Sequence, residues 1–162
     1  MPIPAYKELS EKIEKECLTD PNALYIKSLA NDGSVREYTF GSILVSCNIV
    51  RFFLEGLGCK EHDRVVLLLP YSPAAVITLT GLFYADAIAV PIDYSLPPAE
   101  IQRLIEEIDA AAIINDQAML EKFDDNFTCK YPFLVKREQP TIEDDCVDFW
   151  LAPQGLKKAR VC

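Results

Sequence analysis

The uncharged run from Val65 to Ala85 constrains the fold of this chain more than any other stretch. Pro70 and Pro73 interrupt the run after five aliphatic residues. Proline cannot donate a hydrogen bond to a β-ladder but fits the first turn of a helix, so we expect a buried strand followed by a helix. Residues 87–92 are again strand-like. A strand, a helix and a second strand joined by short turns predict a βαβ unit with parallel strands.

A membrane-spanning helix is the alternative, because the same run is long enough to cross a bilayer. The two prolines would break a lone helix inside the lipid and leave backbone amides and carbonyls without partners. The charged residue Asp86 also follows the run directly. We therefore expect the run to lie in a protein core and predict no transmembrane segment.

The composition indicates a single soluble domain that is large enough to bury a core. Half of the 162 residues are hydrophobic and a quarter are charged, as in ordinary globular proteins. The net charge of −9 argues against nucleic acid and anionic membranes as partners, because binding phosphate groups requires clustered Lys and Arg. Residues 1–16 contain no apolar segment typical of a secretion signal, so we expect a cytoplasmic protein.

The cysteines and the single histidine give no sign of a metal site or a catalytic nucleophile. Six cysteines are widely scattered without a C-x-x-C pair, whereas zinc sites need closely spaced ligands. Reduced thiols that fill small core positions are the simpler interpretation. His62 lies in a polar turn, where a solvated loop histidine is more common than a general base. We therefore predict no catalytic residue and no metal ligand in this chain.

The N-terminal third is expected to form a helix and a β-hairpin, followed by a second helix. Glu and Lys that alternate around apolar residues at helical spacing predict the first helix over residues 6–17. Residues 23–29 and 35–40 are strand-like and are joined by Asn-Asp-Gly-Ser at 31–34, a sequence suited to a tight turn. Thr39 is placed to cap the next helix, because its hydroxyl can accept a hydrogen bond from an amide of the first turn.

The C-terminal half continues the alternation of helix and strand. Apolar residues at helical spacing from Ile101 onward predict an amphipathic helix that begins at Pro98. Short strand-like runs follow at 111–114, 131–135 and 149–151. The whole pattern predicts an α/β fold: a doubly wound, mostly parallel sheet with helices on both faces, plus the N-terminal β-hairpin.

Five short segments match the motifs of one protein family, in the order in which that family has them. These segments are YTF at 38–40, LGCKEHDRV at 57–65, LPYSP at 69–73, LFYADAIAVPID at 82–93 and LPPAEI at 96–101. The chain thereby resembles the N-terminal portion of the AMP-forming acyl ligases. These include acyl-CoA and aryl-CoA synthetases, luciferase and the adenylation domains of non-ribosomal peptide synthetases. Two positions depart from the motifs: Asp86 replaces a glycine, and Glu61-His62 replaces Pro-Gly.

The resemblance implies a two-step reaction for the full-length enzyme. A carboxylate attacks the α-phosphate of ATP to give an acyl-adenylate and pyrophosphate, and CoA or a carrier thiol then takes the acyl group. ATP and Mg²⁺ are the implied cofactors; a carboxylic acid and CoA or a carrier thiol are the implied partners. The motifs matched here are mostly scaffold, and the later nucleotide motifs, the acyl pocket and a C-terminal lysine lie downstream in the family. We therefore expect a fragment that is inactive alone.

The same resemblance divides the chain into an N-terminal sub-domain, residues 1–151, and a divergent or truncated tail, residues 152–162, at the position of the phosphate-binding loop. Aligned without a gap, Gly155 matches the first glycine of that loop. With a three-residue deletion, Gly155 matches the second glycine and Lys158 the loop's lysine. Gly155 and Lys158 are therefore the candidate nucleotide-binding residues. Neither alignment keeps the loop's hydroxyls, so a tail that binds no phosphate is the simpler interpretation.

Two other interpretations stay open. A truncated, non-catalytic relative would bind a regulatory partner or form a homodimer, because a shortened sheet exposes apolar surface. An unrelated flavodoxin-like binding module is the third interpretation, although the chain lacks a Gly-rich phosphate turn after the first strand of the βαβ unit. The acyl substrate is not encoded in this segment, because the family's pocket residues lie downstream.

Overall fold

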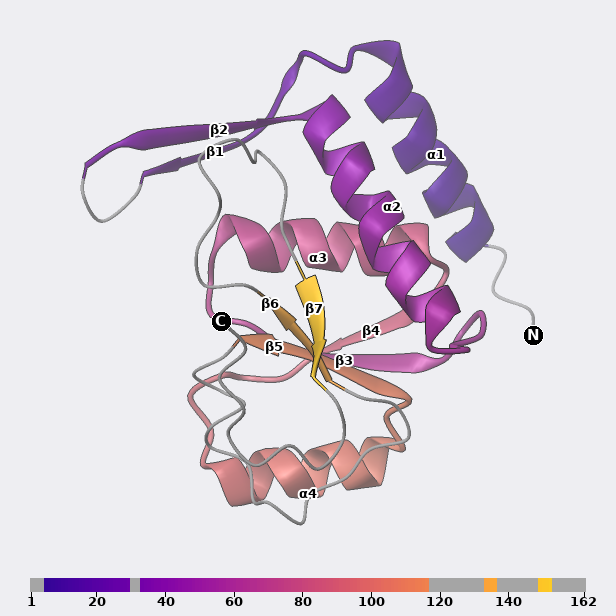
Figure 1. Ribbon diagram of the computed structural model, residues 1–162, viewed down its shortest axis with the longest axis vertical. Helices are drawn as coiled ribbons and strands as arrows, with labels where there is room; N and C mark the ends of the chain where they lie inside the picture. The colour runs from indigo at the N-terminus through magenta and orange to yellow at the C-terminus, as the bar shows by residue number, and fades with distance from the viewer. Residues whose placement is uncertain (1–4, 30–32, 117–132, 137–148, 153–162) are drawn as a thin grey trace.

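The computed structural model describes residues 5–29, 33–116, 133–136 and 149–152 (Figure 1). In chain order the elements are α1 (Ala5–Thr19), β1 (Leu24–Leu29), β2 (Val35–Thr39), α2 (Phe40–Gly56), β3 (Arg64–Leu68), α3 (Pro73–Tyr84), β4 (Ile88–Pro91), α4 (Pro98–Ile108), β5 (Ala112–Asp116), β6 (Phe133–Lys136) and β7 (Phe149–Ala152). β1 and β2 form a two-stranded sheet. The other strands form a five-stranded sheet in the order β4-β3-β5-β6-β7.

The βαβ unit predicted from the uncharged run is confirmed. β3 and β4 are parallel, with Val65 opposite Ala89. Ser72 ends the connection from β3 and caps α3, because its side chain accepts a hydrogen bond from the amide of Ala75. Pro73 then occupies the first turn, where its missing N–H costs nothing. None of the described helices combines the length and the apolar character that a bilayer crossing requires.

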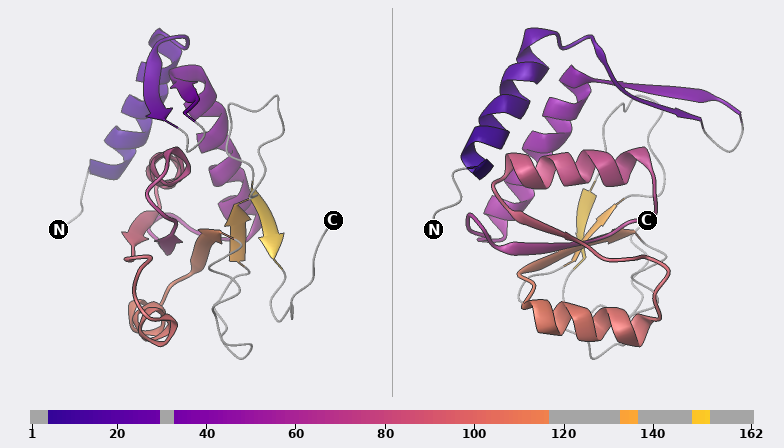
Figure 2. Two further views of the ribbon diagram at one scale, coloured as in Figure 1. Left: turned by 90° about the vertical axis from the view of Figure 1, so that its left-hand side faces the viewer. Right: turned by 180° about the vertical axis from the view of Figure 1, so that it is seen from behind.

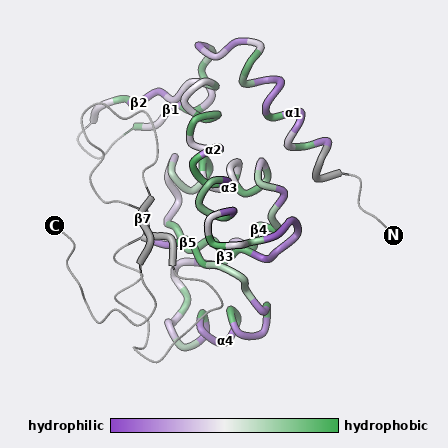
Figure 3. The backbone as a smooth tube through the Cα atoms, turned by 45° about the vertical axis from the view of Figure 1, so that its right-hand side comes forward, coloured by the Kyte–Doolittle hydropathy of each residue, from purple (hydrophilic) through white to green (hydrophobic). Residues whose placement is uncertain are grey.

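β3 is buried on both faces and separates two hydrophobic clusters. Val65 and Leu67 belong to the cluster beneath α2 and α3, whereas Val66 and Leu68 belong to the cluster on α4. Figure 2 shows the layers edge-on, with α3 on one side of the sheet and α4 on the other. The apolar character of α2 and α3 and the mixed character of α4 are visible in Figure 3. The prediction of an α/β fold with a parallel sheet is therefore confirmed.

The strand order places β3 beside both β4 and β5. β5 is parallel to β3, with Val65 opposite Ala112, and β6 is parallel to β5. β7 runs antiparallel to β6, with Phe133 opposite Ala152. The strand predicted over 111–114 is observed two residues longer at its C-terminal end and begins one residue later. A helix-like stretch at 117–123 lies outside the described residues.

β1 and β2 form an antiparallel ribbon that extends away from the helices (Figure 1). Leu29 pairs with Val35 near its outer end, and both side chains are exposed. The inner end is fixed to α3 by a hydrogen bond of 3.1 Å between the Tyr25 and Thr80 hydroxyls. The turn predicted between the strands includes residues 30–32, which are outside the described part of the chain.

α2 and α3 cross closely because a glycine faces a valine at their contact. The predicted cap of α2 is present, with the Thr39 hydroxyl 3.3 Å from the amide nitrogen of Ser42. The apolar face of α2 is buried, and Val50 on this face is 1% exposed. A Cβ atom added to Gly81 would lie 2.9 Å from Cβ of Val50. Gly81 therefore sets the distance between the two helices.

Gly81→Ala should destabilise the fold by roughly 1–3 kcal/mol, because the new methyl group overlaps a branched side chain in a packed core. Urea unfolding monitored by circular dichroism measures this change. Gly56→Ala is the matched control, since it is also helical and an added Cβ would meet nothing within 4 Å. That control should be neutral or slightly stabilising, as alanine is the better helix former. Equal destabilisation by both substitutions would contradict the packing argument.

Candidate functional site

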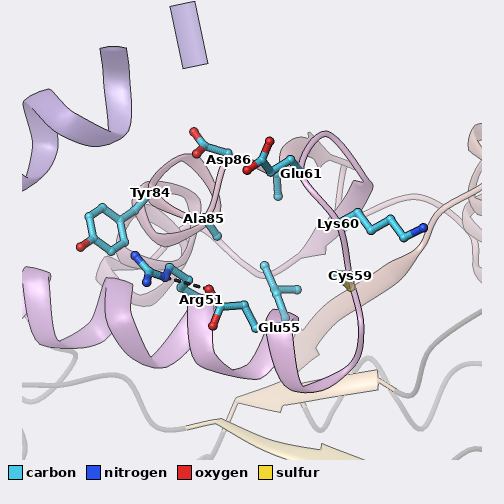
Figure 4. Close-up of a pocket in the computed structure, with 10 residues that line it drawn as sticks. Arg51, Glu55, Cys59, Lys60, Glu61, Tyr84, Ala85 and Asp86 are labelled. Carbon is cyan, nitrogen blue, oxygen red and sulfur yellow. Dashed lines mark hydrogen bonds and ion pairs between the residues drawn. The ribbon is translucent and has the colours of Figure 1, made fainter. Parts of the chain in front are cut away.

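A cavity of about 400 Å³ lies at the edge of the sheet where β3 and β4 begin (Figure 4). It is formed by the C-terminal ends of α2 and α3 and by the short segments that lead into the two strands. Its lining residues are Arg51, Leu54, Glu55, Cys59, Lys60, Glu61, Tyr84, Ala85, Asp86 and Ala87. The volume is near the lower end of the range of about 300–1,000 Å³ that is common for small-molecule sites.

Arg51 is held by two contacts inside this cavity. Its Nε donates a hydrogen bond of 2.9 Å to Oε1 of Glu55, one turn along α2. Its guanidinium carbon also lies 5.7 Å from the centroid of the Tyr84 ring, a distance typical of a cation–π contact. Burial raises the pKa of the Tyr84 phenol, and the Glu14 carboxylate raises it further, whereas Arg51 lowers it. The phenol is therefore a neutral hydroxyl at pH 7 and can donate as well as accept a hydrogen bond.

The two residues that replace glycines of the family's motifs, His62 and Asp86, lie next to each other beside this cavity. His62 has φ 66° and Asp86 has φ 54°, both in the left-handed region. The amide of His62 donates a hydrogen bond of 2.8 Å to the carbonyl of Asp86. Glycine adopts this conformation without cost, and Asp and His adopt it more readily than most other residues do. The backbone geometry thus explains the motif glycines and shows how this chain tolerates their replacement.

Asp86 also carries a buried oxygen atom. Its Oδ1 has no hydrogen-bond partner among the described residues. A buried carboxylate oxygen without a donor is unfavourable, because it loses its hydration and gains nothing in return. The buried Oδ1 of Asp86 is therefore a destabilising feature of the turn that leads into β4.

The opposite edge of the sheet, where β3, β4 and β5 end, is where open α/β sheets generally bind ligands. Asn115 in β5 is fully buried, and neither its side-chain oxygen nor its nitrogen has a partner within the described chain. At the same edge, in the segment that follows β4, Oδ1 of Asp93 accepts hydrogen bonds of 2.8 Å from the amide and the hydroxyl of Ser95. These two bonds lower the pKa of the Asp93 carboxyl.

Sequence reasoning did not single out Asn115 and did not bring together the residues of the cavity. The sequence signal that could have identified Asn115 is its position as the polar residue directly after the apolar run Ala110–Ile114. The cavity residues come from separate elements, so their proximity depends on the packing of α2 against α3. The candidate residues Gly155 and Lys158 lie outside the described residues.

The position of Ala152 nevertheless shows where the chain leaves the sheet. Ala152 ends β7 opposite Phe133, the first residue of β6, and β6 is parallel to β5 and β3. The chain therefore leaves β7 at the edge where the parallel strands begin, which is also the edge of the cavity. The strand order places β7 at one end of the sheet, and β3 and β4 at the other.

The buried thiols of the helical layer differ from the thiol in the cavity. Cys17 in α1 and Cys47 in α2 are buried, at 2% and 0% exposure. Burial raises the pKa of the Cys47 thiol to about 12, and the nearby Cys17 contributes in the same direction. Cys59 is partly exposed and lines the cavity. Cys17 and Cys47 therefore serve as core residues, as the sequence predicted for part of the cysteine set. Within the described residues, no three His, Cys, Asp or Glu side chains are placed to hold a metal ion.

The model of the AMP-binding enzyme family matches residues 12–154. The chain belongs to this family. The resemblance to the AMP-forming acyl ligases is therefore confirmed.

Similar proteins are ligases that are several times longer. 4-Coumarate–CoA ligase 2 of Solanum tuberosum is 28% identical over 157 residues, which are 96% of this chain and 25% of that protein. The long-chain-fatty-acid–CoA ligase of Bacillus subtilis strain 168 is 27% identical over 120 residues, which are 74% of this chain and 21% of that protein. The chain thus spans about a quarter of the length of these relatives.

A solved structure shares the fold. The fatty acyl-adenylate ligase from L. pneumophila, solved in complex with acyl adenylate and pyrophosphate, superimposes with a TM-score of 0.66. The match has 23% sequence identity and covers 82% of this chain and 24% of that one. The described elements therefore have the architecture of one part of a larger ligase.

Asp86→Ala should destabilise the fold by about 1–2 kcal/mol, because alanine is disfavoured in the left-handed conformation. Asp86→Gly should be less destabilising than Asp86→Ala, or stabilising, because glycine adopts φ 54° without strain. Thermal unfolding of both variants beside the native chain measures the difference. An alanine variant as stable as the glycine variant would contradict the conformational explanation of the motif glycine.

Cys17 and Cys47 should be alkylated by iodoacetamide much more slowly than Cys59 in the folded chain at pH 8. With a pKa of about 12, roughly one Cys47 thiol in ten thousand is ionised at that pH, and burial also blocks the reagent. Peptide mass spectrometry after a short exposure reads each site separately. The control is the chain in urea, where the three sites should react at similar rates. Rapid labelling of Cys47 in the folded chain would refute the core role.

Proposed function

We propose that this chain is the N-terminal part of an ATP-dependent, AMP-forming carboxylate ligase. Such an enzyme activates a carboxylic acid as an acyl-adenylate and then transfers the acyl group to CoA or a carrier thiol. The observation that carries the proposal is the family match over residues 12–154. The names of the relatives support it, because they are CoA ligases for 4-coumarate and for long-chain fatty acids. ATP and Mg²⁺ are the cofactors that we assign to the complete enzyme.

The role that we propose for this segment is structural. The five-stranded sheet and its helices would support a nucleotide site built mainly by other parts of the enzyme. A phosphate site needs amide donors and positive side chains around the site of developing charge. Among the described residues, two cationic side chains line the cavity, Arg51 and Lys60, and Arg51 already pairs with Glu55. We therefore propose that the chain alone does not form an acyl-adenylate.

Residues 1–151 are proposed to form the sub-domain, and residues 152–162 to stand at the position of the phosphate-binding loop. Gly155 and Lys158 would be the residues of this tail that approach the nucleotide. Two finer features of the fold belong to the same proposal. The sheet would be doubly wound, because β4 lies on one side of β3 and β5 on the other. β1 and β2 would form a hairpin through residues 30–32.

A cytoplasmic location and self-association complete the proposal. Phe52 on α2 is 71% exposed and Val45, two turns earlier, is 51% exposed. Neighbouring apolar side chains on one helix face form a surface that would favour contact with another copy or with the rest of the enzyme.

ATP–pyrophosphate exchange tests the proposal directly. The chain alone should show no exchange with a panel of carboxylates that includes 4-coumarate and long-chain fatty acids. A chimera in which this chain replaces the matching quarter of the Solanum tuberosum ligase should show exchange with 4-coumarate. Turnover by the chain alone would refute the proposed inactivity, and a folded but inactive chimera would refute the proposed place in the enzyme.

In the same chimera, Lys158→Ala should lower the exchange rate by roughly a hundredfold if this lysine contacts the triphosphate. Lys157→Ala is the matched control, because it removes the same charge from the neighbouring position and should change the rate little. Equal effects of the two substitutions would show that Gly155 and Lys158 do not align with the phosphate-binding loop.

A further inference from the structure

One side of α2 exposes large apolar side chains to solvent. Phe52 is 71% exposed and Val45 is 51% exposed. Ile49 lies between them in the sequence and is partly buried. The three residues are spaced i, i+4 and i+7, so their side chains lie along one side of the helix. These three residues are called the α2 stripe below.

The other sides of α2 are covered by neighbouring helices. Val50 packs against Gly81 of α3, and Cys47 lies close to Cys17 of α1. The Phe52 ring contacts the ring of its neighbour Phe53, with the two centroids 6.1 Å apart, but most of its surface remains in water. Removing such apolar surface from water is favourable. The α2 stripe is therefore a surface that a further apolar element would stabilise.

The polar residues beside the α2 stripe are already engaged with each other. Nδ2 of Asn48 donates a hydrogen bond of 2.9 Å to the carbonyl of Leu44, one turn earlier. Nε of Arg51 donates a hydrogen bond of 2.9 Å to Oε1 of Glu55. A partner would thus meet apolar side chains that are flanked by an amide and a neutral ion pair. The surface that fits them is an apolar one rather than a charged one.

The size of the α2 stripe distinguishes between two kinds of partner. A large aromatic side chain buries about 150–250 Å², so the two strongly exposed residues together offer at most roughly 400 Å². A stable interface between separate proteins takes about 800 Å² from each partner. The stripe alone is therefore too small to join two copies of the chain. A segment of the same polypeptide needs less area, because the covalent link keeps it at a high effective concentration.

The position of the α2 stripe also favours a segment of the same polypeptide. In the left view of Figure 2, α2 lies on the same side of α3 as β6 and β7. β7 is the last described strand, and the chain leaves it at the edge of the sheet where β3 begins. α2 also ends at this edge, directly before the short connection into β3. The match with 4-coumarate–CoA ligase 2 covers 25% of that protein, so most of such an enzyme lies outside the matched segment.

We propose that the α2 stripe is the surface on which an apolar segment of the rest of the ligase packs against this sub-domain. This inference rests on the proposed function, because it requires a longer enzyme, and it adds the contact residues and the chemistry of the partner segment. Val45, Ile49 and Phe52 are then buried, and α2 becomes an internal helix. The largely apolar character of α2 along its length agrees with this role (Figure 3), since a helix that is apolar on more than one side is typical of burial on several sides.

Photo-crosslinking in the chimera with the Solanum tuberosum ligase tests this contact. The photoreactive residue p-benzoylphenylalanine is placed at position 52 or, as the control, at position 18. Leu18 on α1 is also strongly exposed, at 63%. Irradiation should link position 52 to a peptide of the Solanum part, identified by mass spectrometry, whereas position 18 should give no such link. A link from position 52 only to a second copy of the chimera, or no link to the Solanum part, would overturn the proposal.

Phe52→Glu provides a second measurement that does not depend on crosslinking. In the isolated chain it should leave the melting temperature nearly unchanged, because the side chain is exposed. In the chimera it should lower the melting temperature, because the new carboxylate would be buried against apolar groups. Leu18→Glu should have little effect in either protein. Equal melting temperatures of the two chimera variants would contradict the proposal.

The same chimera separates this inference from the proposed function. ATP–pyrophosphate exchange reports the function, and the crosslink reports the contact. An active chimera without the crosslink would refute the contact alone. An inactive chimera that still forms the crosslink would support the contact and refute the proposed place in the enzyme.

Discussion

Burial of β3 on both of its faces is the constraint on which the rest of the structure depends. Val65, Val66 and Leu68 are each 0% exposed, and consecutive side chains enter different hydrophobic clusters. A strand in this position needs hydrogen-bonded neighbours on both edges and helices on both faces, since its backbone and its side chains are all removed from water. The neighbouring strands are β4 and β5, and the covering helices are α3 and α4. Their packing on β3 determines where the cavity and the opposite edge of the sheet lie.

The connections into β3 and β4 combine an unusual backbone conformation with polar side chains. Both strands begin close to a residue in the left-handed conformation, His62 before β3 and Asp86 before β4, and a hydrogen bond joins the two. The family's motifs have glycine at these positions, which would leave backbone alone at this edge. This chain places an imidazole and a carboxylate there instead. A turn that the motif builds from backbone alone thereby acquires two polar side chains.

Most of the described fold was predictable because its signals are local. Prolines, capping residues and apolar spacing marked α2, α3, α4 and the strands between them, and the family motifs marked the order in which they occur. The cavity was not predictable, because Arg51, Glu61 and Asp86 are far apart in the sequence and carry no common motif. Asn115 was missed for a similar reason, since only the packing of the sheet shows that this polar residue is buried.

The sequence by itself determined the family, the βαβ unit and the order of helices and strands, because these follow from hydrophobic periodicity and from short motifs. Only the tertiary structure decided the strand order, the direction of β7 and the contact between α2 and α3 at Gly81. It also decided which residues of α2, α3 and the following turns line the cavity. Those features depend on distances between residues that are remote in the chain, and such distances are set by the packing of whole elements.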